Sequence, residues 1–418
     1  MARLQTLAVA PWPHVGTLAG SAADPYLAAM NPKPALSLAA MRGRRHATLE
    51  LAVEIERRGF AGVYCPSFGD GVGLCEAMAL RTDTLVVGTA IANIYTRHPY
   101  DYALTATLLH ELSGGRFRFG IGISHDPVNR RMGLATGKPL RDVREFVAQL
   151  RKGAQRWGDL PPIVLATLRE KMVRLAAEIG DGAVWANAAR SHLATSLSFL
   201  GDRAGDAAFF TGNMIPTCVS DDRSAAAAVM RKTLTGYVML PNYQNYWIEA
   251  GYEEEMQAIR GAIERGEHDR IPDLMSDAWL ADCTLFGSAS EVRAGVEAWY
   301  ATGLRTPILV PSSTSAGQLD AVREVMAVCG WLARAAGANA RIPAGCSATI
   351  GTSRRRASSS LSSSASRRSR ASCSAAAALL ASISASLASS VALAAPSALR
   401  AASSIQALWV STSAAIIS

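Results

Sequence analysis

The sequence lacks the uninterrupted apolar run that a membrane-spanning helix needs. The apolar stretch 4–10 ends at Pro11 and Pro13, which makes it too short for a span, and no signal-peptide cleavage pattern follows it. A second apolar-rich stretch, residues 375–395, is interrupted by serine throughout. These features predict a protein that neither inserts into a membrane nor is exported.

Cysteines are few, and none is arranged as a metal ligand. Those before residue 340 stand at positions 65, 75, 218, 283 and 329, and they form neither a CxxC motif nor a cysteine–histidine pair at metal-ligand spacing. We therefore predict a reduced, cytoplasmic protein without a structural metal.

Lysine and acidic residues are absent from the C-terminal tail, residues 341–418, which contains eight arginines. The whole chain has 42 basic and 34 acidic residues, so removing those eight leaves 34 of each sign. The region 1–340 is formally neutral, and the net charge of +8 gives no indication of a nucleic-acid partner. Because the tail is almost entirely Ser, Ala and Arg, we predict that it is disordered and separate from a folded domain over 1–340.

Short β-type runs alternate with longer helical patterns through the first 340 residues. Most of the runs are continuously apolar, as expected for parallel strands that are covered on both faces. Eight βα units predict a (β/α)₈ TIM barrel. A doubly wound open sheet is the alternative, but no GxGxxG motif follows the first run. The predicted strands are 4–11, 62–66, 85–92, 116–122, 163–167, 183–186, 209–219 and 306–311.

Glycines mark the ends of two predicted helices, 36–58 before Gly59 and 171–179 before Gly180, where a C-cap favours positive φ. Three connections are longer than a simple link requires. They are residues 12–34 after strand one, 123–139 after strand four and 237–299 after strand seven. Since the loops that follow barrel strands line the C-terminal mouth, we predict functional insertions there.

A long ordered motif resembles the luciferase-like monooxygenase superfamily. Residues 87–125 read VGTAIANIYTRHPYDYALTATLLHELSGGRFRFGIGISH and contain the GT strand, the RxP turn, the TLxxLSGGR helix end and the glycine-rich fourth strand of that group. Residues 161–186 are similar to its fifth and sixth strands, and residues 236–255 look like its coenzyme F420-dependent branch. The resemblance covers residues 1–340.

The resemblance implies a flavin or deazaflavin ring at the barrel mouth. In this family the third strand commonly ends in a bulge with a non-prolyl cis peptide behind the ring, and the corresponding bond here joins Ala90 to Ile91. Ser124, after strand four, offers a hydroxyl to cofactor or substrate. Backbone and cationic groups near helix starts are suited to the phosphate-bearing part of a cofactor. The candidates are Thr167, Leu168, Arg169 and Arg190, although both arginines are equally suited to be surface charges.

The usual proton donor of the deazaflavin-dependent relatives is missing. They carry an acid followed by histidine after strand two, where this sequence has Ser67 and Phe68. His125 is the first candidate replacement, because some relatives hold a catalytic carboxylate at the related position and imidazole titrates near neutral pH. Asp70 and His14 are further candidates. Each has a structural alternative, a helix cap for Asp70 and a loop position for the histidines.

These observations predict an oxidoreductase that transfers a hydride between coenzyme F420 and a small organic substrate, with no metal, nucleic-acid or membrane partner. Two alternatives remain open. One is a monooxygenase that uses reduced FMN and oxygen, and the other is a flavin-binding family member without turnover. The resemblance also implies that the chain can pair as a homodimer.

Overall fold

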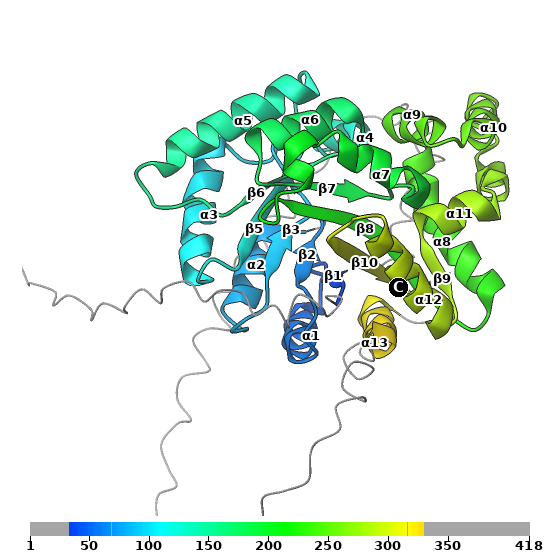
Figure 1. Ribbon diagram of the computed structural model, residues 1–418, viewed down its shortest axis with the longest axis horizontal. Coiled ribbons are helices and arrows are strands. Elements are labelled where there is room, and N and C mark those ends of the chain that lie inside the picture. The colour runs from blue at the N-terminus through cyan, green and yellow to red at the C-terminus, as the bar shows by residue number, and fades with distance from the viewer. Residues whose placement is uncertain (1–32, 68, 316, 330–418) are drawn as a thin grey trace, which may run out of the picture. The chain divides into compact units, whose positions relative to one another are not determined.

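The computed structural model describes residues 33–329, except 68 and 316 (Figure 1). Eight parallel strands close into a barrel, because β10 pairs with β8 on one side and with β1 on the other. The predicted TIM barrel is confirmed. Its strands are β1 (Ala35–Ser37), β2 (Val63–Cys65), β3 (Val87–Thr89) continued by β4 (Ala92–Asn93), β5 (Phe117–Gly122), β6 (Ile163–Ala166), β7 (Gly182–Ala186), β8 (Phe210–Val219) and β10 (Thr306–Ser312).

The first barrel strand lies elsewhere than predicted. β1 overlaps the start of the segment that we assigned to a helix beginning at residue 36, and it pairs in parallel with β2 and β10. The helix α1 begins only at Arg45. The apolar run after Pro34 is short, and such a run fits a buried strand as well as a helix turn. The predicted strand 4–11 and the predicted loop 12–34 precede this first strand, and apart from Lys33 and Pro34 they lie outside the described residues.

Helices surround the barrel (Figure 1). Of the two predicted glycine caps, Gly59 has the expected positive φ of 71°. The prediction of a positive φ at Gly180 was wrong, since its φ is −107°. A glycine is favoured at this position for a different reason, because a Cβ there would lie 2.9 Å from the Ala176 carbonyl oxygen. No helix in the range that the structure describes is long and apolar enough to cross a membrane. The outer helices are α1 (Arg45–Arg57), α2 (Gly71–Ala79), α3 (Pro99–Leu112), α5 (Pro139–Ala154), α6 (Glu170–Ile179), α7 (Arg190–Ser198), α12 (Ala289–Ala301) and α13 (Gln318–Cys329).

Insertions follow the fourth and seventh barrel strands, as predicted. The first contains α4 (Asp126–Arg131), between β5 and α5. The second is much longer, and its short strand β9 pairs with the C-terminal end of β8. Its elements are α8 (Arg223–Val238), α9 (Pro241–Glu249), α10 (Glu253–Glu264), the 3₁₀ helix η3 (His268–Leu274), α11 (Asp277–Cys283) and β9 (Leu285–Gly287). A further 3₁₀ turn, η2 (Gly201–Ala204), follows α7.

Side chains fill the barrel interior. Tyr64 stacks on Phe210 with 5.4 Å between ring centroids, and the Arg118 guanidinium donates to the Tyr64 hydroxyl at 2.8 Å while lying over the Phe210 ring. Because Arg118 and Phe210 stand near the starts of their strands, this cluster closes the N-terminal end. Ala90 and Ile91 pack against the same interior core from the other end and are only partly buried. Binding space for a ring is therefore expected at the C-terminal mouth.

Gly120 permits the closest backbone contact that we find in the barrel. A Cβ at this position would lie 1.8 Å from the Thr89 carbonyl oxygen, which belongs to the neighbouring strand and cannot swing away. The Thr89 hydroxyl donates to the Gly120 carbonyl at 2.6 Å and holds the two strands together. The glycine-rich fourth strand therefore has a structural reason for its composition.

We predict that Gly120→Ala lowers the free energy of unfolding by at least about 1–3 kcal/mol, because the new methyl group forces the two strands apart. The matched control is Gly236→Ala, where a Cβ meets nothing within 4 Å inside helix α8. That control should raise stability by up to about 1 kcal/mol. Chemical denaturation of both variants measures the difference, and equal midpoints for Gly120→Ala and the unmodified chain would contradict the packing argument.

Candidate active site

The junction of β3 and β4 forms a bulge at the mouth. Gly88 and Ala92 are four positions apart in the sequence, but their partners on β5, Arg118 and Ile121, are only three positions apart. The peptide bond between Ala90 and Ile91, inside this bulge, is cis, so the cis bond and the bulge predicted from the sequence are both confirmed. Ala90 N donates to the carbonyl of Cys65 on β2 at 2.8 Å, which fixes the turn to the neighbouring strand.

Two residues at the same end of the barrel adopt left-handed backbone conformations. Ser124 (φ 56°) follows β5 and Asn187 (φ 55°) follows β7, and they are the only non-glycine residues with positive φ in the described part of the chain. Such conformations cost about 1–3 kcal/mol each and cluster at functional sites. Both lie at the carboxyl ends of barrel strands, where barrel enzymes place their active-site residues.

His125 lies in an aromatic cluster built by two insertions. Its ring meets the rings of Tyr237, from α8, and Tyr243, from α9, edge to face at 5.9 and 5.8 Å, and the two tyrosines are 5.2 Å apart. Burial lowers the pKa of His125 below its usual value, and the neighbouring Asp126 carboxyl offsets part of this effect. Burial also raises the pKa of Tyr237 and of Tyr243. All three rings are therefore neutral at pH 7.

Asn187 joins this cluster from the loop after β7. Its backbone N donates to the Met214 carbonyl at 3.0 Å, and its backbone O accepts from the indole of Trp247, on α9, at 3.2 Å. Contact with the Asn187 side chain offsets part of the rise in pKa of both Tyr237 and Tyr243, so the amide faces their hydroxyls. We did not identify Asn187 or the two tyrosines from the sequence, although an asparagine after a predicted strand is a signal for a left-handed turn.

Asp70 serves as a helix cap. Its carboxylate accepts from Gly73 N at 2.9 Å at the start of α2, and the Arg97 guanidinium lies 3.4 Å away. The Asp70 side chain is 60% exposed. The helix cap is the structural alternative that the sequence allowed. His14, the third catalytic candidate, lies outside the described residues.

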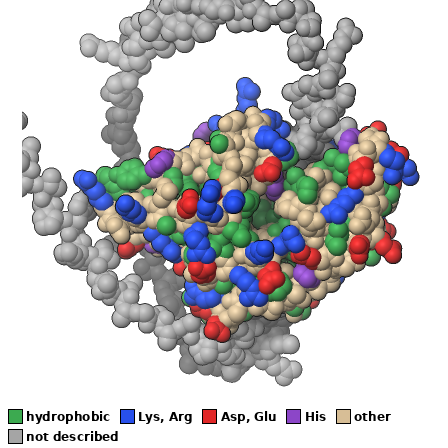
Figure 2. Space-filling model, turned by 90° about the horizontal axis from the view of Figure 1, so that it is seen from above, with side chains coloured by type: hydrophobic (Ala, Val, Ile, Leu, Met, Phe, Trp, Pro, Cys, Tyr) green, Lys and Arg blue, Asp and Glu red, His purple; other side chains and the backbone are tan. Residues whose placement is uncertain are grey.

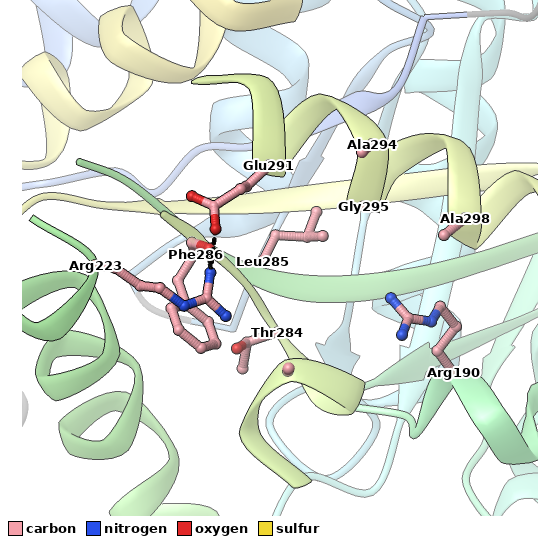
Figure 3. Close-up of a pocket in the computed structure, with 10 residues that line it drawn as sticks. Arg190, Arg223, Thr284, Leu285, Phe286, Glu291, Ala294, Gly295 and Ala298 are labelled. Carbon is pink, nitrogen blue, oxygen red and sulfur yellow. Dashed lines mark hydrogen bonds and ion pairs between the residues drawn. The ribbon is translucent and has the colours of Figure 1, made fainter. Parts of the chain in front are cut away.

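The candidate phosphate-binding residues are held in different ways. Thr167 is buried, with its hydroxyl 3.4 Å from the Val184 carbonyl, and Leu168 packs against the core. Arg169 forms an ion pair with Glu249 of α9. Arg190 lies 4.0 Å from Asp282 in a groove of about 450 Å³ between α7, β9 and α12, which also holds the Arg223–Glu291 ion pair (Figure 3).

Charged side chains of both signs are interspersed on the face shown in Figure 2, in agreement with the formal neutrality of the region before the tail. Among the described residues, no group of three or more His, Cys, Asp or Glu side chains is placed to hold a metal ion. The five cysteines of this part are free and buried.

We predict that Asp70→Ala lowers the free energy of unfolding by about 1 kcal/mol, because the first turn of α2 loses its cap, whereas Asp70→Asn keeps the cap and stays within about 0.5 kcal/mol. Thermal and urea denaturation of the two variants measure this difference. A large loss of turnover in Asp70→Asn without loss of stability would show that the carboxylate has a chemical role instead.

Similarity to known proteins agrees with this geometry. A Mycobacterium tuberculosis protein named as a candidate coenzyme F420-dependent oxidoreductase is 24% identical over 296 residues, which are 59% of this chain and 83% of that protein. The structure of the coenzyme F420-dependent tetrahydromethanopterin reductase of Methanopyrus kandleri superposes with a TM-score of 0.57 at 16% identity, covering 71% of this chain and 97% of the reductase.

An F420-dependent secondary alcohol dehydrogenase in complex with an F420–acetone adduct also has the same fold, with a TM-score of 0.53, 16% identity, and coverage of 71% of this chain and 98% of the dehydrogenase. The family described as luciferase-like monooxygenase matches residues 27–306. This match extends from before β1 to the first residue of β10 and confirms the resemblance seen in the sequence. The chain belongs to the luciferase-like monooxygenase family.

Proposed function

We propose that the protein is an oxidoreductase that transfers a hydride between coenzyme F420 and a small organic substrate at the barrel mouth. The observation that carries the proposal is His125, a neutral imidazole half-buried among tyrosines at the carboxyl end of β5. A neutral imidazole is suited to accept the proton that a substrate hydroxyl releases when it loses a hydride. The named coenzyme of three relatives, F420, supports the choice of cofactor.

The residues at the mouth fit a flat ring. Ala90, Ile91, Ala186 and Val310 are apolar and only partly buried, and they pack against the interior core from the mouth end. Their side chains leave the backbone of the β3–β4 junction available as a platform. Arg169 and Arg190 remain the proposed cations for the acidic part of the cofactor. The cofactor would have to compete with Glu249 for Arg169 and with Asp282 for Arg190.

Coenzyme F420 supplies the hydride acceptance and donation when it is bound. Ala90 and Ile91 hold the ring, and Ser124 offers a hydroxyl at the start of the β5 insertion. The α8–α9 insertion covers His125 and limits the access of water, which also keeps the imidazole neutral. His125 then takes a proton from the substrate hydroxyl during oxidation and returns it during reduction.

The second candidate is a monooxygenase that uses reduced FMN and oxygen, which the description of the matched family favours. The two coenzymes differ in their reaction with oxygen, because coenzyme F420 has a carbon in place of the flavin ring nitrogen N5 and its reduced form reacts poorly with oxygen. We predict that titration of the purified protein with coenzyme F420 gives saturable binding and that the protein does not raise oxygen consumption by reduced FMN above the rate of the protein-free control. Protein-dependent oxygen consumption with reduced FMN, together with no F420 binding, would instead support the monooxygenase.

A substitution at His125 tests its proposed role in proton transfer. We predict that His125→Asn lowers turnover by about 10²–10⁴-fold with any alcohol or ketone found to be a substrate, while the affinity for F420 changes little. The matched control is His192→Asn, because His192 is also partly buried, also lies edge to face against a tyrosine, Tyr246, and also has a lowered pKa. Loss of F420 binding in His125→Asn would indicate a structural role instead.

The pH dependence should follow the pKa of His125. Because burial lowers this pKa, the neutral base persists below pH 6.5, and the rate of substrate oxidation should fall only when the pH drops below the lowered value. The other titratable groups that face His125 are Asp126, on its own helix, and Tyr237 and Tyr243, whose raised pKa values keep them protonated throughout this range. An acid limb that is unchanged in His125→Asn would contradict the assignment.

A further inference from the structure

Two buried asparagine side chains link the β3–β4 junction to the segment that carries His125. Asn93 is the last residue of β4 and is 4% exposed, and Asn129 belongs to α4 and is 1% exposed. Asn93 Nδ2 donates to Asn129 Oδ1 at 2.8 Å, although the two residues are 36 positions apart in the sequence. This bond joins the strand that continues β3 to the insertion that follows β5.

The side chain of Asn93 is fixed on the β4 side. Its Oδ1 accepts from the backbone N of Tyr95 at 3.1 Å. Its backbone O accepts from the hydroxyls of Thr96, at 2.8 Å, and Tyr102, at 3.1 Å. Asn93 is also the register partner of Gly122 on β5. The amide of Asn93 is therefore held at a set position relative to the β3–β4 junction, which directly precedes it.

Asn129 holds both ends of the short turn that places His125. Its Nδ2 donates to the carbonyl of Ile123 at 2.8 Å, and its backbone N donates to the carbonyl of His125 at 2.9 Å. Ser124 lies between these two carbonyl groups and has a φ of 56°. A left-handed residue other than glycine persists only where the surrounding contacts fix it. Asn129 supplies two of these contacts.

Backbone groups at the two ends of this linkage determine how each amide is oriented. The N–H of Tyr95 requires an acceptor, so Asn93 presents Oδ1 to it and Nδ2 to Asn129. The carbonyl of Ile123 requires a donor, so Asn129 presents Nδ2 to it and Oδ1 to Asn93. Reversal of either amide would bring two donors or two acceptors together. A buried polar network of this kind is rigid, because each bond supports the next.

We propose that Asn93 and Asn129 are positioning residues, which set the distance and orientation of His125 relative to the β3–β4 junction. This inference rests on the proposed function, in which the cofactor ring lies against that junction and His125 moves a proton. Both amides act through His125, since they are buried and hydrogen-bonded within the chain. A misplacement of about 1 Å lowers a rate by about 10²-fold, so a linkage without a reacting group still controls turnover.

Two variants break the linkage and keep the fold. Asn93→Ser retains a hydroxyl that accepts from the nearby N–H of Tyr95, but the side chain is too short to reach Asn129. Asn129→Leu keeps the branched shape of asparagine and leaves no cavity, but it removes both hydrogen bonds of the side chain. The double variant contains both changes. Circular dichroism and thermal denaturation establish that each variant is folded.

The first readout is the pKa of His125, measured by NMR titration of the histidine side chains without cofactor, with His125→Asn to assign the signal. When the linkage is broken, the turn admits water to the imidazole. We therefore expect the lowered pKa to rise toward its usual value of 6.5 in both variants. The other titratable groups that face His125 are Asp126, Tyr237 and Tyr243, and none of them is changed.

Thr82→Ala is the matched control. Thr82 is 5% exposed, donates to the Met78 carbonyl at 2.7 Å and accepts from the Arg116 guanidinium at 3.3 Å. It precedes β3 and so lies at the opposite end of the barrel from the mouth. Its substitution should lower the Tm, as loss of the asparagine linkage does, and leave the pKa of His125 unchanged.

The second readout is turnover with coenzyme F420 and any substrate that the protein accepts. Asn93→Ser and Asn129→Leu should each lower kcat by about 10-fold to 100-fold, with little change in KM or in F420 affinity. The double variant should lose no more than the larger of the two single losses, because both residues act through one linkage. Thr82→Ala should keep the kcat of the unmodified chain.

Three outcomes would overturn the proposal: an unchanged pKa of His125 in both asparagine variants, an equal rise in Thr82→Ala, or losses in kcat that multiply in the double variant. The proposed function fails separately. If F420 does not bind but the pKa of His125 rises in the asparagine variants, the cofactor assignment is wrong and the positioning of His125 stands. If F420 binds and His125→Asn loses turnover while the asparagine variants keep it, only the present inference is wrong.

Discussion

The contact between α9 and the loop after β7 is the interaction on which the candidate site depends. Trp247 donates to the Asn187 carbonyl, and Tyr246 accepts from Ala189 N. Each bond contributes only about 1 kcal/mol, but together they hold the long insertion across the mouth of the barrel. This contact helps to hold Tyr243 against His125, because the two residues are on insertions that follow different strands. The barrel provides the frame, and the insertion completes the site.

The two ends of the barrel strands differ in structure, because one end stabilises the fold and the other end forms the candidate site. At the N-terminal end, Tyr64, Arg118 and Phe210 fill the interior and stabilise the fold. At the other end, the chain leaves β3, β5 and β7 through a bulge and two left-handed residues, which are unfavourable as isolated conformations. The small apolar residues Ala90 and Ala186 are only partly buried there. Such local departures from regular structure are expected where a protein binds its ligands.

The sequence predicted the features that depend on local pattern. Continuous apolar runs identified buried strands such as β6 and β8, and the motif around residues 87–125 located the cis bond. β1 was missed because its apolar run is too short to distinguish the periodicity of a strand from that of a helix. We therefore assigned its residues to the helix that follows it. Asn187 was missed because its importance comes from Met214 and Trp247, which are distant in the sequence. The position of His125 after the fourth strand was predictable, but its aromatic surroundings were not, since they arise from tertiary contacts.

We propose that the mouth of this barrel holds a deazaflavin ring between the β3–β4 junction and the His125 cluster. A crystal structure of the protein with bound coenzyme F420 tests this placement most directly. We expect a ring that lies against Ala90 and Ile91, with His125 facing its reactive side. A ring bound elsewhere, for example in the groove beside Arg190 and α12, would contradict it.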